Sequence, residues 1–392
     1  MKILHVLATL DPASGGPTES VLQCGSLLAG QGHAVEVLTL DHVDAPFIRE
    51  FPLPVHAVGP SWGTFRYSRG LVPWLKFHVG DYDVIIINGI WQYNCFGAWR
   101  VLRRSRTPYF VYVHGMLDPW FKRAYPLKHL KKWLFWPWGV YPVLRDARAV
   151  LFTCEEERRL ARDSFWLYSA RERVLKYGTA SPPADDAAVR EEFLGRYPHI
   201  RCVRPILFLS RIHEKKGCDL LIRAFARIHA LEPQLHLILA GPGEDALLAH
   251  LKALATKLDV SNHITWTGML TPPLKWAAFY CAEAFILPSH QENFGIAVAE
   301  ALGCGLPVLI SDKVNIWREI EQAGAGFVAP DTVDGTESSL RRWAGLDAAA
   351  RAEMKIRANA TFKEHFTLDA MTTSLLDTLK LESGMLAVAV HE

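Results

Sequence analysis

Short apolar runs alternate with helical stretches along this chain, and the alternation occurs twice. The first series ends before a polar, proline-containing segment at 179–186, and the same rhythm begins again at Ile206–Leu209. Apolar runs without alternating polar residues are typical of parallel strands covered by helices on both faces. The pattern therefore predicts two α/β domains joined by a linker.

The runs of strand length in the first half are expected at Lys2–Leu7, Ala34–Leu40, Val55–Val58, Val84–Asn88, Tyr109–Val113, Ala149–Phe152 and Arg173–Leu175. Those in the second half are expected at Ile206–Leu209, Leu235–Ala240, His263–Trp266, Ala284–Leu287 and Pro307–Ile310. Helical periodicity predicts helices at 18–29, 96–103, from Glu155 onward, and at 218–231, 246–258, 296–302 and 362–381. Thr153 and Glu156 have the spacing of a capping box at the start of the third of these helices.

The bulk properties limit the class of protein. A length of 392 residues favours two domains over one core. No apolar run approaches the roughly 20 residues of a membrane span, and the N-terminus is expected to form a strand rather than a signal peptide. Seven cysteines without a CxxC pair favour a reducing compartment, and a net charge of +2 excludes no class of partner.

Two glutamates, Glu292 and Glu300, lie where the apolar run Ala284–Leu287 gives way to a helical pattern. Ligands bind at this edge of open α/β sheets, and a helix start adds free N–H donors that favour an anion. Carboxylates accept strong hydrogen bonds from adjacent sugar hydroxyls. The alternative for Glu300 is a favourable interaction with the helix dipole alone.

A basic loop follows the first predicted strand of the second half and contains Arg211 and Lys216. An Arg and a Lys on one loop can converge on a diphosphate, the Arg as a fork and the Lys as a point charge. A solvated basic loop is the alternative, but its position at the end of a strand favours an anion site.

The first half offers two further candidates. Gly15 and Gly16 follow the first strand, where glycine lets the backbone approach a ligand closely. His114 follows another strand and is expected at the ligand-binding edge of its sheet, although a single His in such a place is often structural. A dinucleotide-binding enzyme with Asp41 on a ribose is the runner-up hypothesis, but GxGxxG is absent. The pair Asp81 and Asp83 resembles a metal-binding DxD but precedes its strand, so it is expected to be a solvated turn.

Cations alternate with large aromatic residues over 120–145. Such a segment fits an anionic membrane surface, with Trp at the interface. It fits equally a core helix with one solvated face. Nucleic-acid stacking is a third hypothesis, but no nucleic-acid motif accompanies the segment.

Taken together, these motifs resemble retaining, nucleotide-sugar-dependent glycosyltransferases of family 4, which have the GT-B fold. The resemblance rests on Gly15-Gly16, His114-Gly115, Arg211 with Lys216, the stretch Glu292 to Glu300, and the run Ala301 to Val308. The segment His114 to Trp120 is similar to members that build bacterial exopolysaccharide or O-antigen. The chain departs from the family at Tyr177-Gly178-Thr179, where many members have Asn-Gly-Val.

The resemblance implies an α/β fold with two Rossmann-like domains facing a cleft. The first would span 1–180 and bind the acceptor, and a C-terminal helix at 362–382 would cross back to complete it. The second would span 181–361 and bind the nucleotide-sugar donor.

The resemblance also implies roles for single residues. The catalytic group would be His114 near the sugar 6-hydroxyl, Arg211 and Lys216 on the diphosphate, and Glu292 on the transferred sugar. Glu300 would hold the ribose hydroxyls. The remaining donor contacts would come from Gly15, Gly16, Gly268, Met269, Leu270, Asn293, Phe294, Gly295 and Ile296.

The implied function is a hexosyltransferase that retains anomeric configuration and needs neither a cofactor nor a metal. Its donor would be a GDP- or UDP-sugar, with GDP-mannose a guess based only on the exopolysaccharide-like resemblance. Its acceptor would be a glycan or a polyprenyl-linked glycan in bacterial polysaccharide or lipopolysaccharide biosynthesis, and no nucleic acid is implied. The expected location is the cytoplasm, with peripheral contact of 120–145 to the inner face of the cytoplasmic membrane. The alternatives are a GT-B epimerase or phosphorylase and a non-catalytic protein that binds sugar nucleotides or glycans.

Overall fold

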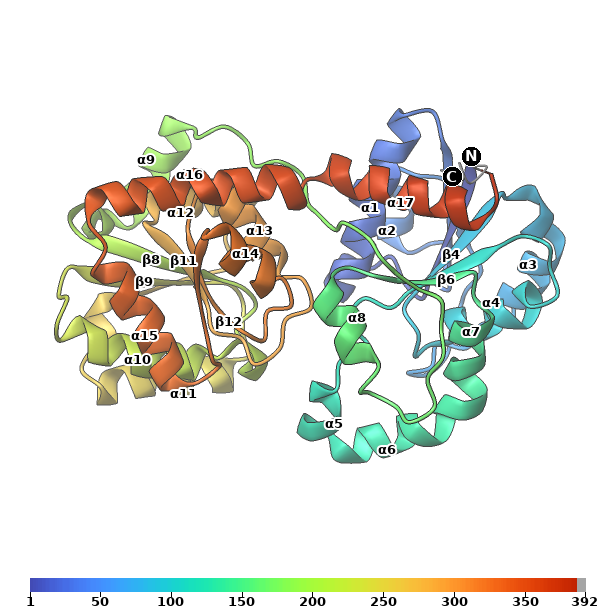
Figure 1. The fold of residues 1–392 in the computed structure, drawn as a ribbon, viewed down its shortest axis with the longest axis horizontal. Helices are drawn as coiled ribbons and strands as arrows, with labels where there is room; N and C mark the ends of the chain where they lie inside the picture. Colours follow the sequence, from blue (N-terminus) through green and yellow to red (C-terminus); the bar gives the residue numbers. More distant parts are fainter. Residues whose placement is uncertain (386–392) are drawn as a thin grey trace, which may run out of the picture. The chain divides into compact units, whose positions relative to one another are not determined.

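The computed structural model describes residues 1–385 and divides them into two compact α/β units. Residues 1–177 and helix α17 (Leu368–Glu382) form the first unit, and residues 178–367 form the second. Each unit contains one parallel sheet with helices packed against it (Figure 1). Within residues 1–385, no helix combines the length and apolar character needed to cross a membrane.

The sheet of the first unit has seven parallel strands in the order β3-β2-β1-β4-β5-β6-β7. Their bounds are β1 Lys2–Leu7, β2 Ala34–Thr39, β3 Val55–Ala57, β4 Val84–Asn88, β5 Tyr109–Tyr112, β6 Ala149–Phe152 and β7 Glu172–Val174. The helices of this unit besides α17 are α1 Gly16–Gly30, α2 Pro46–Arg49, α3 Leu71–His78, α4 Tyr93–Leu102, α5 Trp120–Ala124, α6 Pro126–Phe135, α7 Tyr141–Asp146 and α8 Glu155–Ala161.

The sheet of the second unit has six parallel strands in the order β10-β9-β8-β11-β12-β13. Their bounds are β8 Arg204–Leu209, β9 Leu235–Ala240, β10 Ile264–Gly268, β11 Ala284–Leu287, β12 Val308–Ser311 and β13 Gly326–Ala329. The helices are α9 Ala187–Arg196, α10 Cys218–His229, α11 Asp245–Lys257, α12 Pro272–Cys281, α13 Ile296–Gly303, α14 Trp317–Ala323, α15 Val333–Ala344 and α16 Ala348–His365. Short helical turns lie at Pro12–Ser14, Val79–Asp81, Trp136–Val140, Pro198–Cys202, Glu214–Lys216 and Ser261–His263.

The central strands are buried on both faces. All five residues of β4 are buried, which matches its unbroken apolar run Val84 to Ile87. Strand β4 lies between β1 and β5 and hydrogen-bonds to both. Because a parallel sheet has helices on both faces, such a strand needs apolar side chains in both directions.

The helices cover the sheets with one apolar face each. Helix α10 shows the rule, because Leu221, Ile222, Phe225 and Ile228 recur at helical spacing and are fully buried. The largest fully buried side chains of the two cores are Phe110, Trp136 and Phe152 in the first unit and Phe193, Phe208, Phe225, Phe279, Phe285 and Trp343 in the second.

The C-terminal helix predicted at 362–382 is wrong as a single element. The structure contains α16 and α17 there, with a break at Phe366-Thr367. Thr367 forms a parallel bridge with Thr179, and the Thr179 N–H donates to the Phe366 carbonyl at 3.0 Å. The extended backbone that makes this bridge cannot continue a helix, so the chain divides here.

The predicted capping box of Thr153 and Glu156 is also wrong. The N-cap of α8 is Cys154, whose sulfur accepts from the Glu157 N–H at 3.4 Å. Thr153 instead donates its hydroxyl to the Glu157 carboxylate at 2.7 Å. A carboxylate four residues after Thr153 therefore takes the place of the expected one, and its other contacts are important for the site below.

Candidate functional site

The loop after β11 is held by two neighbouring loops of the second unit, those after β8 and β12. The His290 N–H donates to the Lys215 carbonyl at 2.8 Å, in the loop after β8. The Glu292 N–H donates to the Lys313 carbonyl, and the Glu292 carbonyl accepts from the Asn315 N–H, each at 3.0 Å. Because β8, β11 and β12 are adjacent parallel strands, their loops meet at one edge, and this contact fixes the backbone on which Glu292 lies.

Two glycines permit this arrangement. Gly217 has φ = +64°, and a Cβ on it would lie 2.2 Å from the Pro288 carbonyl oxygen. Gly295 has φ = +79° and is the N-cap of α13. Side chains at either position would be strained, and at Gly217 the loops after β8 and β11 would also be forced apart.

Lys216 and Glu292 come together at this edge as an ion pair. The Lys216 ammonium donates to the Glu292 carboxylate, and the two side chains are 13% and 22% exposed. Arg211 lies in the same loop as Lys216 and is exposed, with no ion pair recorded for it among residues 1–385. The edge therefore holds one cation paired with a carboxylate and one cation open to solvent.

Glu300 is separated from this pair and has a partner that the sequence did not indicate. Its carboxylate accepts from the Lys275 ammonium at 2.7 Å, and Glu300 itself is buried in α13. The Lys275 ammonium also lies 4.2 Å from the centre of the Trp276 ring. No motif or spacing connects Lys275 with Glu300, because the contact depends on how α12 and α13 pack.

The remaining predicted donor-binding residues of this unit differ in how far their side chains are exposed. The Phe294 side chain is buried and lies edge-on to Phe366, with ring centres 5.6 Å apart, so this side chain belongs to the core. Asn293 Oδ1 accepts from Asn315 Nδ2 at 3.4 Å, and Ile296 is half-buried at the start of α13. At the end of β10, Gly268 is exposed with φ = +66°, Met269 is 76% exposed and Leu270 is half-buried.

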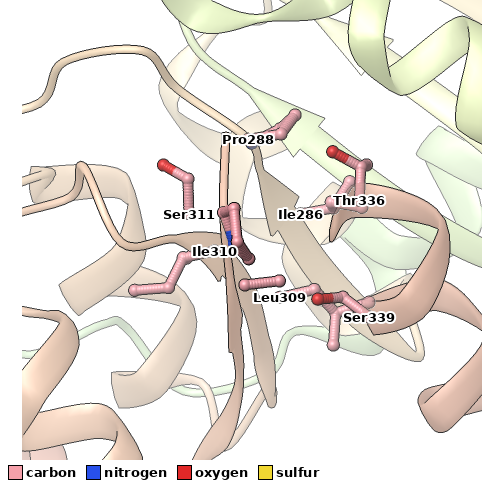
Figure 2. A pocket seen from close by; sticks show the side chains of 9 residues that line it. Ile286, Pro288, Leu309, Ile310, Ser311, Thr336 and Ser339 are labelled. Atoms are coloured by element: carbon pink, nitrogen blue, oxygen red, sulfur yellow. The ribbon is translucent and has the colours of Figure 1, made fainter. Parts of the chain in front are cut away.

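A small cavity lies at the ends of β11 and β12. Figure 2 shows Ser311 on β12 and Thr336 and Ser339 on α15 around it. Its volume is about 10 Å³, the space of a single water molecule. It is far too small for a nucleotide sugar, so it is no donor site.

In the first unit, His114 lies beyond the end of β5 in an uncommon backbone conformation, with φ = +49°. Its Nε2 is 3.1 Å from Asn88 Oδ1, and Asn88 Nδ2 is 3.3 Å from His5 Nδ1. The amide oxygen only accepts, so Nε2 of His114 carries a proton. The His114 ring also stacks on Tyr112, with ring centres 4.4 Å apart.

Burial keeps both histidines neutral. It lowers the pKa of His114 to about 3, with a smaller contribution from His5, and it lowers the pKa of His5 to about 4. A neutral His114 with its proton on Nε2 has a free acceptor at Nδ1. Asn88 and His5 were not predicted as site residues, since the sequence showed them only as parts of strands.

Glu157 fixes the turn at His114. Its buried carboxylate accepts from the Gly115 N–H at 2.5 Å and from the Thr153 N–H at 2.6 Å, in addition to the Thr153 hydroxyl. The carboxylate therefore joins the ends of β5 and β6, and the unusual backbone at His114 is held by a charge-assisted hydrogen bond at the next residue. The sequence pattern that came nearest to this contact was the pair Thr153 and Glu156, but the carboxylate that bonds Thr153 is that of Glu157, one residue later.

Gly15 and Gly16 lie where the chain enters α1. Gly15 is the N-cap with φ = +86°, and Gly16 is the first helical residue. The Cβ positions of both glycines are open, with no atom within 4 Å. The Gly15 N–H donates to the Pro12 carbonyl at 3.3 Å and Pro17 has no N–H, so the Gly16 N–H is the donor that this turn can offer a ligand.

The structure argues against the dinucleotide-binding hypothesis, in which Asp41 would contact a ribose. Asp41 accepts from the Thr39 hydroxyl at 2.6 Å, from the Leu10 N–H at 2.7 Å and from the Thr9 hydroxyl at 2.8 Å, and it pairs with Arg66 at 2.7 Å. These contacts leave the buried carboxylate no role on a ribose. Within residues 1–385, no cluster of three or more His, Cys, Asp or Glu has the arrangement of a metal site.

Two family models match the chain. The model described as "Glycosyl transferases group 1" matches residues 203–359, and the model described as "Glycosyl transferase 4-like domain" matches residues 15–178. The first includes the loops of Lys216 and Glu292, and the second includes His114. The chain belongs to the family 4 type of glycosyltransferase.

Curated relatives agree with this family. The D-inositol 3-phosphate glycosyltransferase of Jonesia denitrificans is 28% identical over 208 residues, which are 50% of this chain and 47% of that protein. The alpha-monoglucosyldiacylglycerol synthase of Streptococcus pneumoniae is 25% identical over 356 residues, 83% of this chain and 77% of that protein. The chain spans about half the length of the inositol phosphate enzymes that it matches.

Solved structures agree with the fold. Sucrose-phosphate synthase from Thermosynechococcus elongatus has a TM-score of 0.77 at 18% identity, covering 98% of this chain and 100% of that one. Anabaena HepE in complex with UDP-glucose has a TM-score of 0.75 at 18% identity, covering 97% and 100%. The expected GT-B fold with two Rossmann-like α/β units is confirmed.

Glu157→Gln is predicted to destabilise the first unit of this glycosyltransferase by about 2 kcal/mol, the usual value of hydrogen bonds to a buried charge. The NH₂ group of the new amide would also face the N–H of Gly115 or Thr153, and two donors cannot form a hydrogen bond with each other. Urea unfolding should show the loss, and hydrogen exchange at Gly115 should quicken. Glu155→Gln on the same helix is the matched control, because Glu155 makes only an exposed pair with Arg158. Equal effects of the two substitutions would contradict the role of Glu157.

His114 is predicted to remain uncharged across the pH range of enzyme assays. Because the folded-state pKa values of His114 and His5 lie below the unfolded value of about 6.5, the unfolded chain gains protons first as the pH falls. The stability that they contribute is complete above about pH 6.5 and is lost as the pH falls towards 4. Imidazole NMR shifts should show no titration of His114 between pH 8 and pH 5. A His114 midpoint near pH 6.5 would contradict the prediction.

Proposed function

We propose that this chain transfers a sugar from a nucleotide-diphosphate sugar to a glycan or lipid-linked glycan acceptor, with retention of configuration. The observation that carries the proposal is the ion pair of Lys216 with Glu292 at the ends of β8 and β11, with the exposed Arg211 on the same loop as Lys216. A diphosphate needs cations and a sugar needs hydroxyl acceptors, and this edge supplies both. The family membership of the chain supports the same class of reaction.

Each group at this edge has a proposed task. Arg211 and Lys216 would bind the donor diphosphate and stabilise the charge that develops as it leaves. Glu292 would accept hydrogen bonds from hydroxyls of the transferred sugar. Glu300, held by Lys275, would take the ribose hydroxyls.

Backbone groups would complete the donor site. The N–H groups at Gly295 and Ile296 belong to the start of α13, where a helix favours negative charge. The open backbone at Gly268 and the exposed Met269 would lie against the nucleotide base.

His114 and the Gly15–Gly16 turn are proposed as the contributions of the first unit to the same reaction. A neutral His114 would accept a sugar hydroxyl at Nδ1, because its Nε2 proton is already directed at Asn88. Such a histidine is a hydrogen-bonding group and no acid or base at neutral pH. This assignment agrees with a front-face mechanism, in which the leaving phosphate itself assists the acceptor hydroxyl.

Metal independence is also proposed, since Arg211 and Lys216 would neutralise the diphosphate in place of a divalent ion. Transfer in excess EDTA should equal transfer with added Mg²⁺. Loss of transfer in EDTA would contradict this point without affecting the rest of the assignment.

The acceptor is proposed to lie in or on a membrane, because helix α6 has its apolar face turned outward. Leu127, Leu130 and Leu134 recur at helical spacing on that face, and Leu127 is 79% exposed. Lys128 and Lys131 lie beside them and are exposed. A leucine face flanked by lysines fits an anionic lipid surface.

The inward face of α6 includes two polar side chains, His129 and Lys132, beside the apolar Phe135. Lys132 lies over the rings of Trp91 and Phe121, and burial lowers its pKa to about 8. His129 stacks on Phe165, with ring centres 4.9 Å apart. A helix that sends a lysine inward and leucines outward is opposite to the usual surface helix, which supports a lipid partner for its outer face.

The same region contains core residues further along the chain, so the core hypothesis holds for the later part of 120–145. Trp136, Val140, Val143 and Leu144 are fully buried. Trp138 is 59% exposed and would reach the lipid interface together with the leucines. Peripheral binding to the inner face of the cytoplasmic membrane remains a proposal for α6 alone.

Lys216→Ala is predicted to reduce transfer by at least about 100-fold, the usual cost of removing one group that stabilises developing negative charge. Incorporation of labelled sugar from UDP-glucose or GDP-mannose into bacterial membrane extracts measures transfer. Arg211→Ala should have a similar effect. Lys257→Ala, an exposed lysine at the end of α11, is the control and should be neutral. Full transfer by a folded Lys216→Ala protein would refute the diphosphate site.

Changing both Lys128 and Lys131 to Glu is predicted to lower the partition onto phosphatidylglycerol vesicles by more than tenfold, because each lysine near such a surface contributes about 1 kcal/mol. The matched control changes the exposed Lys257 and Lys363 to Glu, with the same change in net charge. Sedimentation with vesicles measures the partition, and phosphatidylcholine vesicles should bind neither protein well. Equal sedimentation of both variants would refute the lipid surface.

A further inference from the structure

The first unit contains a large polar cavity that the proposed reaction does not use. Its volume is about 460 Å³, and five arginines contribute to its lining. They are Arg103, Arg106, Arg145, Arg148 and Arg171. The only carboxylate in the lining is that of Asp146.

The charge in this cavity is poorly balanced. Arg145 pairs with Asp146 at 2.8 Å, and the Arg103 guanidinium lies 4.6 Å from the centre of the Trp99 ring. Among residues 1–385, no ion pair is recorded for Arg106 or Arg171. Like charges held together without partners destabilise a fold, so a cluster of this kind favours an anion that neutralises it.

The cavity also offers oriented polar groups. Arg148 is fixed by donation of its Nε–H to the carbonyl of Glu382. The Ser383 hydroxyl is buried without a hydrogen-bond partner in the described structure. Thr107 and Ser105 are half-buried in the lining. Guanidinium groups together with a hydroxyl that lacks a partner are the kind of donors that bind phosphate oxygens.

The place of the cavity separates it from the candidate reaction site. Pro108 and Tyr109 stand at the beginning of β5, and Ala147 and Arg148 precede β6. His114 lies beyond the other end of β5. The four residues of β5 alone span about 13 Å, so the cavity opens at the opposite edge of the sheet from His114.

Helix dipoles account for part of the arginine cluster. Arg103 follows α4 and Arg145 lies in the last turn of α7, and basic residues are favoured at both helix ends. This explanation does not cover Arg106, Arg148 and Arg171, which lie on loops before strands. The cluster therefore exceeds what the helix ends require.

We propose that this cavity binds a phosphate-bearing anion, separately from the nucleotide-sugar donor. Arg106 and Arg171 would bind the phosphate oxygens directly, and Ser383 would donate one hydrogen bond. The shared chemistry is a cluster of phosphate oxygens, which either a soluble polyphosphorylated compound or an anionic lipid headgroup supplies. At the edge remote from His114, such a ligand would act as an effector or an anchor and not as a substrate.

Titration calorimetry of the full chain with inorganic tripolyphosphate tests the proposal. The variant with Arg106→Glu and Arg171→Glu should bind at least tenfold more weakly than the unchanged chain. The matched control changes Arg104 and Arg223 to Glu, two exposed arginines outside the cavity lining, and should keep the affinity. Lys216→Ala should also keep it, which distinguishes this site from the proposed donor site. All four substituted arginines are exposed, so thermal unfolding should confirm that both variants fold.

Vesicle sedimentation distinguishes the two sources of phosphate. If the ligand is a lipid headgroup, the Arg106/Arg171 variant will also lose binding to phosphatidylglycerol vesicles. If the ligand is soluble, that variant will keep vesicle binding while losing tripolyphosphate. Undetectable tripolyphosphate binding by the unchanged chain, or equal affinities of the cavity variant and the control, would overturn the proposal.

Discussion

The pairing of β8 with β11 is the constraint on which the candidate donor site depends. Ala284 lies opposite Ile206 and Phe285 opposite Leu207 in this parallel pair, so both strands deliver their following loops to the same edge. The loops then touch so closely that Gly217 has no room for a side chain beside Pro288. Lys216 and Glu292, 76 positions apart in sequence, meet because of this contact. The first unit follows the same logic, since β1, β4 and β5 bring His5, Asn88 and His114 into one hydrogen-bonded series.

Much of the fold could be predicted from the sequence, because parallel strands buried on both faces leave unbroken apolar runs. β4, β6, β9 and β11 have the predicted bounds, since each ends at a polar residue, a glycine or a proline. The break at Phe366-Thr367 could not be predicted. The break depends on the bridge between Thr367 and Thr179, which are separated in sequence by almost the whole second unit. Local helical periodicity gives no sign of such a distant contact.

The site shows the same division between local and distant causes. Lys216 and Glu292 follow strands, and that local position was enough to expect them at a ligand-binding edge. The partners that orient the site residues were not foreseeable, because Lys275 reaches Glu300 and Glu157 reaches Gly115 only through tertiary packing. Phe294 shows the reverse case, since a residue inside the strongest motif directs its side chain into the core, where it lies against Phe366.

The ion pair of Lys216 with Glu292 gives the proposed donor site a particular behaviour. The two side chains are only 13% and 22% exposed, so each charge needs a partner and the pair can separate only when another charged group replaces the lost contact. A diphosphate carries more negative charge than one carboxylate and can therefore compete for the Lys216 ammonium. In the proposed complex the lysine would turn to the phosphate, and the released Glu292 carboxylate would take new hydrogen bonds from the hydroxyls of the sugar. Without the donor, the pair prevents two like-charged groups, Lys216 and Arg211, from standing unneutralised on one loop. In the free protein, Lys216 and Glu292 hold the loops after β8 and β11 together. In the proposed complex, Lys216 would bind the diphosphate of the donor and Glu292 would bind its sugar.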